Sequence, residues 1–417
     1  MHSKKPLVGL RAALPIFIVI LFATSAYPAT EKIVHDFSDN GSDGYYPYNS
    51  LIFDKTGNLY GTTVFGGTNG SGTVVELTPK GGGLWTETVL HNFGSGADGT
   101  YPYGNLIFDA SGNLYGTTQT GGTAGVGTVF EMTPTTKGVW KEKVLHSFAL
   151  NGKDAATPLA GVIFDTSGNL YGTSELGGIY DSGAVFELSP KAGGGWTEKV
   201  LHSFDPNGKD GTFPNAGVIV NGSGNLFGTT LEGGTAGLGT AFELSPKAGG
   251  GWKETVLHSF SSNGKDGYLV FAGLIFDGAG NLYGATSVGG TKSGGTVFEL
   301  TPKAGGGWKE EILYNFAYAQ GSDPFGRLIF DASGNLYGTM GTGGVYAEGT
   351  VFKLTVEGSG KWAQTVLHNF NDDGTDGYDP IGGLIFDASG NLDGTTYHGG
   401  SSTSCSDGCG TVFEIKL

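Results

Sequence analysis

The chain has 417 residues, of which 79 are glycine, and only 15% of its residues are charged. No G-X-Y period accompanies the glycines, which excludes a collagen-like fold. With 38% hydrophobic and 12% aromatic residues, the chain is not a disordered low-complexity polymer. Its net charge of −16 excludes nucleic-acid binding through a basic surface, because that affinity depends on Lys and Arg.

The first 26 residues have the pattern of a secretory signal peptide. The basic segment MHSKKPLVGLR precedes the apolar segment AALPIFIVILFATSA, which ends in small residues. Pro15 interrupts the apolar run, and the run is shorter than the roughly 20 residues that a spanning helix needs. We therefore expect export to the periplasm or the extracellular space, with no membrane contact after cleavage; an uncleaved anchor is the alternative.

A short apolar motif, LIFD or a near variant, recurs along the rest of the chain. It begins at Leu51, Leu106, Val162, Val218, Leu274, Leu328 and Leu384. The spacings are 55, 56, 56, 56, 54 and 56 residues, so seven repeats fill the chain from about residue 31 to its end. Repetition at this period is typical of solenoids and β-propellers.

Each repeat is predicted to form four short strands, which we name A, B, C and D. In the second repeat these are residues 106–109, 113–118, 128–134 and 140–148. The D-x-x-G-N segment between A and B favours a hairpin turn, with Asp as the cap and Gly at positive φ. Small four-stranded sheets repeated seven times predict an all-β, seven-bladed β-propeller.

The chain begins and ends within a repeat, and this predicts how the ring closes. A lone D strand, residues 31–37, begins the mature chain, and strands A, B and C of the last repeat end it. We expect the first strand to pair with the last three, which would remove the exposed edges. Residues 27–417 are thus predicted to be one monomeric propeller domain.

The repeated string FDASGNLYGTTxxGGxxxxGTVFEL resembles the Gloeo/Verruco ("GloVer") tandem repeat of exported bacterial proteins. The resemblance covers residues 51–417. It implies an exported repeat protein and brings no particular reaction with it.

Residue types that recur in every repeat are expected to serve the fold. Six histidines occupy one position of strand D, and Tyr314 takes that place once. Ligands spread around a ring cannot converge on one metal ion, so we interpret these histidines as structural. The six are His35, His91, His146, His202, His258 and His368.

An Asp is also found in every connection between strands D and A. These residues are Asp43, Asp98, Asp154, Asp210, Asp266, Asp323 and Asp376. Together with neighbouring aromatic residues they suit Ca²⁺ or carbohydrate hydroxyls, and calcium is the one cofactor that the sequence suggests. The alternative is seven capped turns, and the turns lack the EF-hand spacing.

Residues that break the symmetry are better site candidates. Arg327, the only arginine after residue 11, precedes the sixth LIFD motif, and His398 lies in the seventh B–C loop. With Tyr46, Tyr101, Phe213 and Tyr378 they form the candidate ligand-binding face. Drift within a repeat array is the alternative. Asp393, which replaces a strand-B aromatic residue, is predicted to lie too far from His398 to pair with it.

Cys405 and Cys409 are the two cysteines of the chain. In an exported protein, two cysteines this close together predict a disulfide. Metal binding by C-x₃-C with His398 is the alternative.

The sequence favours a binding or scaffold protein whose partner is an extracellular glycan or an envelope protein. One alternative is a secreted lyase or glycosidase that acts on the loop face, and another is a purely structural surface protein. No catalytic residue is assigned, because G-x-S-x-G, H-E-x-x-H and the P-loop are all missing from the sequence.

Overall fold

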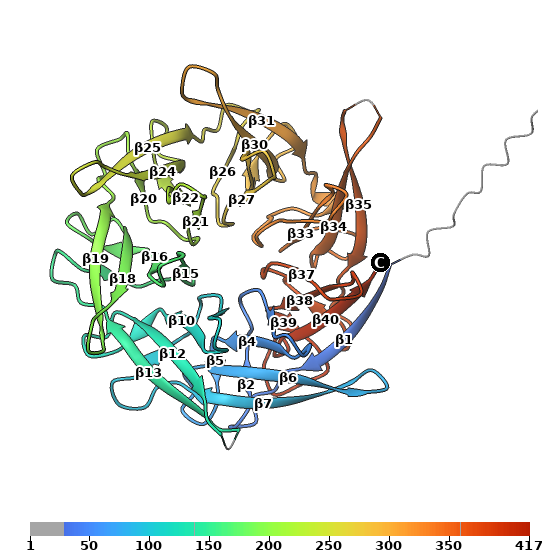
Figure 1. Cartoon of the computed structure of the whole chain (residues 1–417). Coiled ribbons are helices and arrows are strands. Elements are labelled where there is room, and N and C mark those ends of the chain that lie inside the picture. Colours follow the sequence, from blue (N-terminus) through green and yellow to red (C-terminus); the bar gives the residue numbers. More distant parts are fainter. Residues whose placement is uncertain (1–28, 137, 359) are drawn as a thin grey trace, which may run out of the picture.

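Seven four-stranded antiparallel sheets form a closed ring in the computed structural model, as Figure 1 shows. The structure describes residues 29–136, 138–358 and 360–417, so the predicted signal peptide lies outside the described residues. The predicted seven-bladed propeller is confirmed. No helix of the described residues is long and apolar enough to cross a membrane.

The four strands of each sheet are arranged side by side in the order A, B, C and D, with strand A at the central axis and strand D at the rim. The innermost A strands are β3 (Ile52–Phe53), β9 (Ile107–Phe108), β15 (Ile163–Phe164), β21 (Ile219–Val220), β27 (Ile275–Phe276), β32 (Ile329–Phe330) and β37 (Ile385–Phe386). The B strands are β4 (Leu59–Thr63), β10 (Leu114–Thr118), β16 (Leu170–Ser174), β22 (Leu226–Thr230), β28 (Leu282–Thr286), β33 (Leu336–Met340) and β38 (Leu392–Thr396).

The outer two strands of each sheet are longer. The C strands are β6 (Thr73–Gly81), β12 (Thr128–Pro134), β18 (Ala184–Pro190), β24 (Thr240–Pro246), β30 (Thr296–Pro302), β34 (Thr350–Val356) and β40 (Thr411–Lys416). The D strands at the rim are β7 (Leu84–Asn92), β13 (Trp140–Ser147), β19 (Trp196–Ser203), β25 (Trp252–Ser259), β31 (Trp308–Asn315), β35 (Trp362–Asn369) and β1 (Thr30–Asp36).

The first strand closes the ring. β1 pairs antiparallel with β40, with Ile33 opposite Phe413 and His35 opposite Val412. The start of β1 and the C-terminus lie together at the rim (Figure 1). The predicted closure is therefore confirmed.

The D–A connections and the B–C loops lie on the same face of the ring, which we call the loop face. In six blades a two-residue strand of the D–A connection pairs with one of the B–C loop. The connection strands are β2 (Gly44–Tyr45), β8 (Gly99–Thr100), β14 (Ala155–Ala156), β20 (Gly211–Thr212), β26 (Gly267–Tyr268) and β36 (Gly377–Tyr378). The loop strands are β5 (Phe65–Gly66), β11 (Thr120–Gly121), β17 (Leu176–Gly177), β23 (Glu232–Gly233), β29 (Val288–Gly289) and β39 (His398–Gly399).

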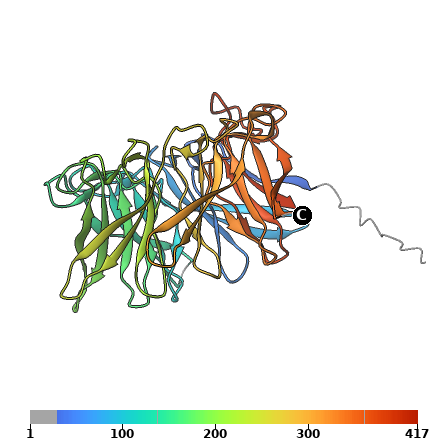
Figure 2. The same cartoon turned by 90° about the horizontal axis from the view of Figure 1, so that it is seen from above.

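The remaining blade has a one-turn 3₁₀ helix, η1 (Tyr318–Gln320), in its D–A connection, and a single bridge joins Ser322 to Thr342. Seen from the side, loops extend from both faces of the ring (Figure 2).

The sheets pack on one another through aromatic and aliphatic side chains. Phe93 and Phe130, from neighbouring blades, are fully buried with ring centroids 5.1 Å apart. Gly116 makes room for this layer, because a Cβ there would lie 2.5 Å from Cζ of Phe130. The repeated Y-G-T of strand B thus reflects a close approach between backbone and ring.

A β-bulge in the D strands decides which neighbour each side chain faces. Val129 pairs with His146 and Phe130 pairs with Val144, so Leu145 is an extra residue. Side chains alternate between the faces of a strand, and one extra residue reverses that alternation. The Glu and the His four residues apart on a D strand therefore face opposite neighbouring blades.

Candidate functional site

A central cavity of about 520 Å³ is lined by residues at and just before the A strands of all seven blades. Most of the lining is apolar, including Ile52, Ile107 and Phe325. No carboxylate or histidine lines the cavity within the described parts of the chain. The cavity therefore has the mostly apolar walls that are typical of a binding pocket.

Arg327 is the charged residue of this cavity. Its side chain is exposed to the channel, and it makes no hydrogen bond or ion pair with any residue that the structure describes. Partial desolvation by the walls of the channel lowers the pKa of its guanidinium, which nevertheless remains protonated at neutral pH. Since the donors of this cation are unused, the channel is suited to an anionic group.

A cluster of half-buried aromatic residues lies on the loop face, and we call it the aromatic cluster. Its members are Tyr45, Tyr46, Tyr48, Phe65, Tyr101, Tyr103, Tyr378 and Tyr397. The ring centroids of Tyr46 and Tyr397 are 4.8 Å apart in a stacked arrangement. Tyr48 contacts Tyr103 at 4.8 Å and also lines the central cavity, so the cluster reaches the channel.

His398 lies within this cluster and pairs with a carboxylate. Its Nδ1 atom is 2.7 Å from Oδ2 of Asp379, and its ring is 5.1 Å from that of Tyr46. Asp379 has a φ of 53°, a conformation in which Asp is tolerated better than most residues. Asp379 is not among the site residues predicted from the sequence, where its one signal is the D-P pair that precedes Ile381.

The candidate residues of the loop face do not all come together. Tyr46, Tyr101 and Tyr378 belong to the aromatic cluster. Phe213 has the same positive φ as Tyr46 and Tyr101 but lies three and two blades away from them. Neither His398 nor these four residues line the cavity that holds Arg327.

Six of the seven predicted Asp residues occupy equivalent places, and each lies near the rim beside the strand-D position that usually holds histidine. Asp323 does not. It has a φ of 57° and accepts a hydrogen bond from Thr342 Oγ1 at 2.7 Å, so it corresponds to Asp379. The Ser322–Thr342 bridge matches the Tyr45–Phe65 pair, which places Gln320 at the position of Asp43. The sixth connection is shorter, and this misaligned the sequence comparison. Calcium binding at the other six stays a prediction.

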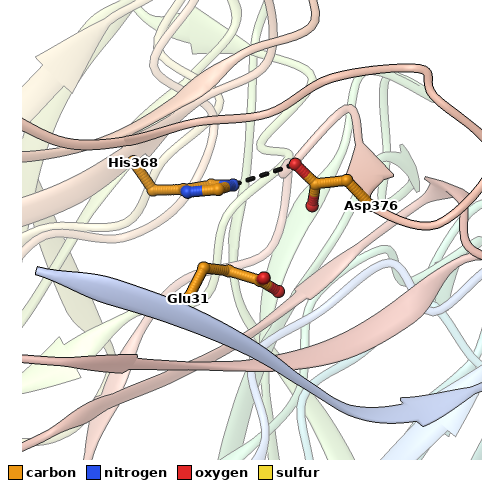
Figure 3. A group of neighbouring side chains, drawn as sticks. All are labelled: Glu31, His368 and Asp376. Atoms are coloured by element: carbon orange, nitrogen blue, oxygen red, sulfur yellow. Dashed lines mark hydrogen bonds and ion pairs between the residues drawn. The ribbon is translucent and has the colours of Figure 1, made fainter.

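A His and a Glu of the next blade lie near each of these six Asp residues, and in five cases one ligand atom from each of the three residues lies within 4.8 Å of the other two. His91 Nε2 lies 2.9 Å from Asp98 Oδ2, and Glu142 completes the group. Similar groups are His35–Asp43–Glu87, His146–Asp154–Glu198, His258–Asp266–Glu310 and His368–Asp376–Glu31. We call them seam clusters and name each by its two D strands. Figure 3 shows the β35/β1 cluster, in which Glu31 lies beside the His368–Asp376 pair.

The glutamates at these seams are half-buried, and one carboxylate oxygen of each is buried without a hydrogen-bond partner. The Oε1 atoms of Glu31, Glu87, Glu142, Glu198, Glu254 and Glu310 have no partner among the described residues. Burial, followed by the nearby Asp43 carboxylate, raises the pKa of Glu87 to about 8. Burial and Asp376 raise the pKa of Glu31 to about 7. The sequence predicts structural histidines, and their Glu partners are not visible in the repeat pattern.

Cys405 and Cys409 lie beside the aromatic cluster. Their Cα atoms are 5.3 Å apart, within the usual span of a disulfide, and their Sγ atoms are paired in the structure. The backbone N–H of Tyr46 donates to the carbonyl oxygen of Cys409 at 2.9 Å. The loop that contains the cysteines therefore helps to hold the cluster in place.

The fold defines a seven-bladed β-propeller with an arginine-bearing channel and an aromatic loop face. The family model described as the Gloeobacter/Verrucomicrobia repeat matches residues 20–219 and again 194–413. The chain belongs to this repeat family, as its sequence resemblance implied. No curated protein matches the sequence.

Solved structures share the fold at low sequence identity. An ancestral GH74 enzyme is 12% identical with a TM-score of 0.56, covering 93% of this chain and 51% of its own. A Bacteroides uniformis protein whose structure is described as that of a 6-phosphogluconolactonase is 15% identical with a TM-score of 0.48, and the match covers 83% of this chain and 89% of its own. A protein of unknown function from Dyadobacter fermentans is 11% identical with a TM-score of 0.46, covering 93% and 98%. The similarity to the GH74 enzyme shows the propeller fold alone.

Proposed function

We propose that the protein is an exported binding module whose loop face takes an extracellular glycan that carries a carboxylate. The aromatic cluster beside a channel with an unpaired arginine is the observation that supports this function. In this proposal residues 1–26 are a signal peptide and residues 27–417 the mature, monomeric propeller.

The aromatic cluster supplies the sugar-binding part of the site. Tyrosine offers a large apolar ring for contact with a sugar face and a hydroxyl group for hydrogen bonds. Burial, followed by nearby Asp372, raises the pKa of Tyr378 to about 12, so its hydroxyl stays protonated and available as a donor. The cluster members are half-buried, so their positions are set before a ligand arrives.

Arg327 supplies the part of the site that selects an acidic ligand. A guanidinium binds a carboxylate through two parallel hydrogen bonds, and low local polarity strengthens them. The protein has a net charge of −16 and should repel anions over most of its surface. Arg327 gives the channel a positive charge at which an anion can bind. A glycan with uronate residues matches both parts of the site.

Calorimetric titration of the mature protein with neutral and uronate-containing oligosaccharides tests the proposal. We expect uronate oligosaccharides to bind, Arg327→Asn to weaken them at least tenfold, and Tyr46→Ala to weaken all ligands. Phe213→Ala is the matched control, because Phe213 has the same backbone position outside the cluster. If no oligosaccharide binds, a protein partner or a purely structural role replaces the glycan.

A second candidate function, a lyase or glycosidase on the loop face, rests on the His398–Asp379 pair. A carboxylate that holds one ring nitrogen orients the histidine, and the other nitrogen is then placed to act as a base. Turnover of any bound oligosaccharide that is abolished by His398→Asn would favour this enzyme. Unchanged ligand after long incubation would favour the binding module.

A further inference from the structure

The β1/β7 seam cluster brings together three unpartnered donor atoms. Nε2 of His35, Oδ1 of Asp43 and Oε1 of Glu87 are all buried, and none has a hydrogen-bond partner among the described residues. One ligand atom from each residue lies within 4.8 Å of the other two, and His35 Nε2 is 4.0 Å from Glu87 Oε2. Three unsatisfied polar atoms facing one another are a rare arrangement in a folded protein.

Asp43 is held so that one oxygen faces the seam. Only 7% of the residue is exposed, and its Oδ2 atom accepts hydrogen bonds from the backbone N–H and the hydroxyl of Ser38. These bonds leave Oδ1 directed at the cluster without a partner. The Nε2 atom of His35 has no hydrogen-bond partner among the described residues either, and it faces the same space.

Two buried carboxylates facing each other need a proton or a cation between them. Like charges at this separation raise each other's energy, and burial removes the water that would screen them. A divalent cation satisfies all three donor atoms at once.

At one other seam of the ring, all three equivalent positions carry different residue types. At the β31/β35 seam they are Tyr314, Gln320 and Gln364, and none of these side chains is charged at neutral pH. If the three residues served only local packing, nothing would link the loss of the histidine to the loss of both carboxylates. Their joint replacement indicates that they act as one unit.

We propose that the β1/β7 seam cluster binds a divalent transition-metal ion of the zinc class through His35, Asp43 and Glu87. The other four His–Asp–Glu clusters are repeats of this site. In these the His lies close to its Asp, at 2.9 Å in the β7/β13 cluster, so the ion must separate a hydrogen-bonded pair. We therefore expect the β1/β7 site to be the tightest.

The donor set favours zinc over calcium. One imidazole nitrogen and two carboxylates are ligands typical of Zn²⁺, with a fourth position left for water. Ca²⁺ takes six to eight oxygen ligands, and the cluster has too few. This inference therefore differs from the calcium ring suggested by the sequence, although it uses the same Asp residues.

Metal binding at these seams would tie the closing strand to both of its neighbours. β1 carries Glu31, which faces β35, and His35, which faces β7 (Figure 3 shows the first of these). The bulge at Val34 points the two side chains in opposite directions. An ion in each cluster would hold β1 from both sides.

Titration of EDTA-treated mature protein with Zn²⁺, Ca²⁺ and Mg²⁺ tests the proposal by calorimetry and elemental analysis. We expect at least one zinc ion to bind tightly per chain and to raise the melting temperature, with no comparable effect of Ca²⁺ or Mg²⁺. Co²⁺ should give visible absorption bands of nitrogen and oxygen coordination. Absence of zinc binding, or tighter binding of Ca²⁺, would overturn the proposal.

The double variant His35→Tyr/Glu87→Gln assigns the site, because it reproduces two residues that the β31/β35 seam already carries. We expect the tightest zinc affinity to fall at least tenfold, while Arg327→Asn leaves it unchanged. Tight zinc binding that persists in the double variant would contradict the assignment. If the double variant does not fold, the Co²⁺ spectrum of Glu87→Gln decides between the two outcomes. None of these measurements depends on glycan binding.

Discussion

The side-chain amide of Gln364 donates a hydrogen bond to the carbonyl oxygen of Gln320 at 3.0 Å, across the seam between β35 and β31. This neutral contact stands where the other six seams place a carboxylate beside a histidine. It shows that the blades pack without charge at this position. The charged groups of the other seams are therefore not required by packing alone.

Gln364→Glu should destabilise the protein above neutral pH. The variant loses the amide donor and adds a carboxylate to a seam that has Tyr314 in place of the histidine. The nearby cation is Lys292, whose Nζ atom stays 5.5 Å from the centre of the Tyr314 ring. We expect the free energy of unfolding at pH 8 to fall by about 1–3 kcal/mol, measured by urea denaturation. Thr365→Glu, which adds the same charge at the exposed neighbouring position, should change it by less than about 0.5 kcal/mol. Equal stability of Gln364→Glu and wild type would refute this account.

Asp393 should make stability fall as the pH rises. The residue is 3% exposed, its Oδ2 atom has no hydrogen-bond partner among the described residues, and it stands where five other blades carry tyrosine. Burial, then Asp387 and Glu414, raises its pKa to about 8. A carboxyl with a raised folded-state pKa contributes stability below its unfolded pKa, near 4, and that contribution is lost as the pH rises to about 8.

Asp393→Asn removes this titration. We expect the variant to be more stable than wild type by at least about 2 kcal/mol at pH 8.5, and by much less at pH 5. Urea denaturation at both pH values measures the difference. Asp372→Asn at an exposed position is the control. If the two variants show the same pH dependence as wild type, Asp393 is ionised in the folded protein.

The repeat pattern predicted the fold and its closure because both depend on features visible in one dimension. The LIFD period counted the blades, and the offset of the first D strand predicted that β1 pairs with β40. The seam clusters could not be predicted, because a bulge at Leu145 and its equivalents reverses the alternation along strand D. On a regular strand, Glu142 and His146 would share a face and would not meet the residues of two different blades.

The site residues were predicted less well for a related reason. The sequence predicts that Asp323 is equivalent to Asp43, because every connection contains an Asp. The sixth connection is two residues shorter, however, and this places Asp323 at the position of Asp379. Asp379 was not noticed, because its pairing with His398 depends on a positive φ that a sequence pattern does not reveal. Arg327 was identified because a lone arginine in a repeat array stands out by residue type.

Arg327→Asn should leave the unliganded fold intact. Asn105 occupies the same position in the second blade, so the backbone accepts this residue. The side chain is exposed to the channel and has no ion-pair partner among the described residues, so its replacement should change the free energy of unfolding by less than about 0.5 kcal/mol. Thermal denaturation measures this, and Arg327→Lys keeps the charge as a control. A large loss of stability would mean that the guanidinium supports the channel wall.

Cys405 and Cys409 should form a disulfide in the purified protein and support the aromatic cluster. Intact mass should show the loss of two hydrogen atoms, restored by a reductant. Cys405→Ser/Cys409→Ser should cost about 2 kcal/mol or less, because the closed loop is short. It should also weaken oligosaccharide binding, since the Cys409 carbonyl accepts the Tyr46 N–H. Free thiols in protein purified under oxidising conditions would contradict the disulfide.

A chain that begins at Ser38 should not form a stable monomer. Without β1, strand β40 becomes an exposed edge, and the seam residues Glu31 and His35 are lost with it. Open edges pair with other chains, so we expect oligomers or aggregates in light scattering after gel filtration. A synthetic peptide of residues 29–38 should restore the monomer, whereas the same peptide with Ile33→Pro should not, because proline cannot donate in the ladder with Phe413. A stable monomer without any peptide would show that three strands of the last blade suffice to close the ring.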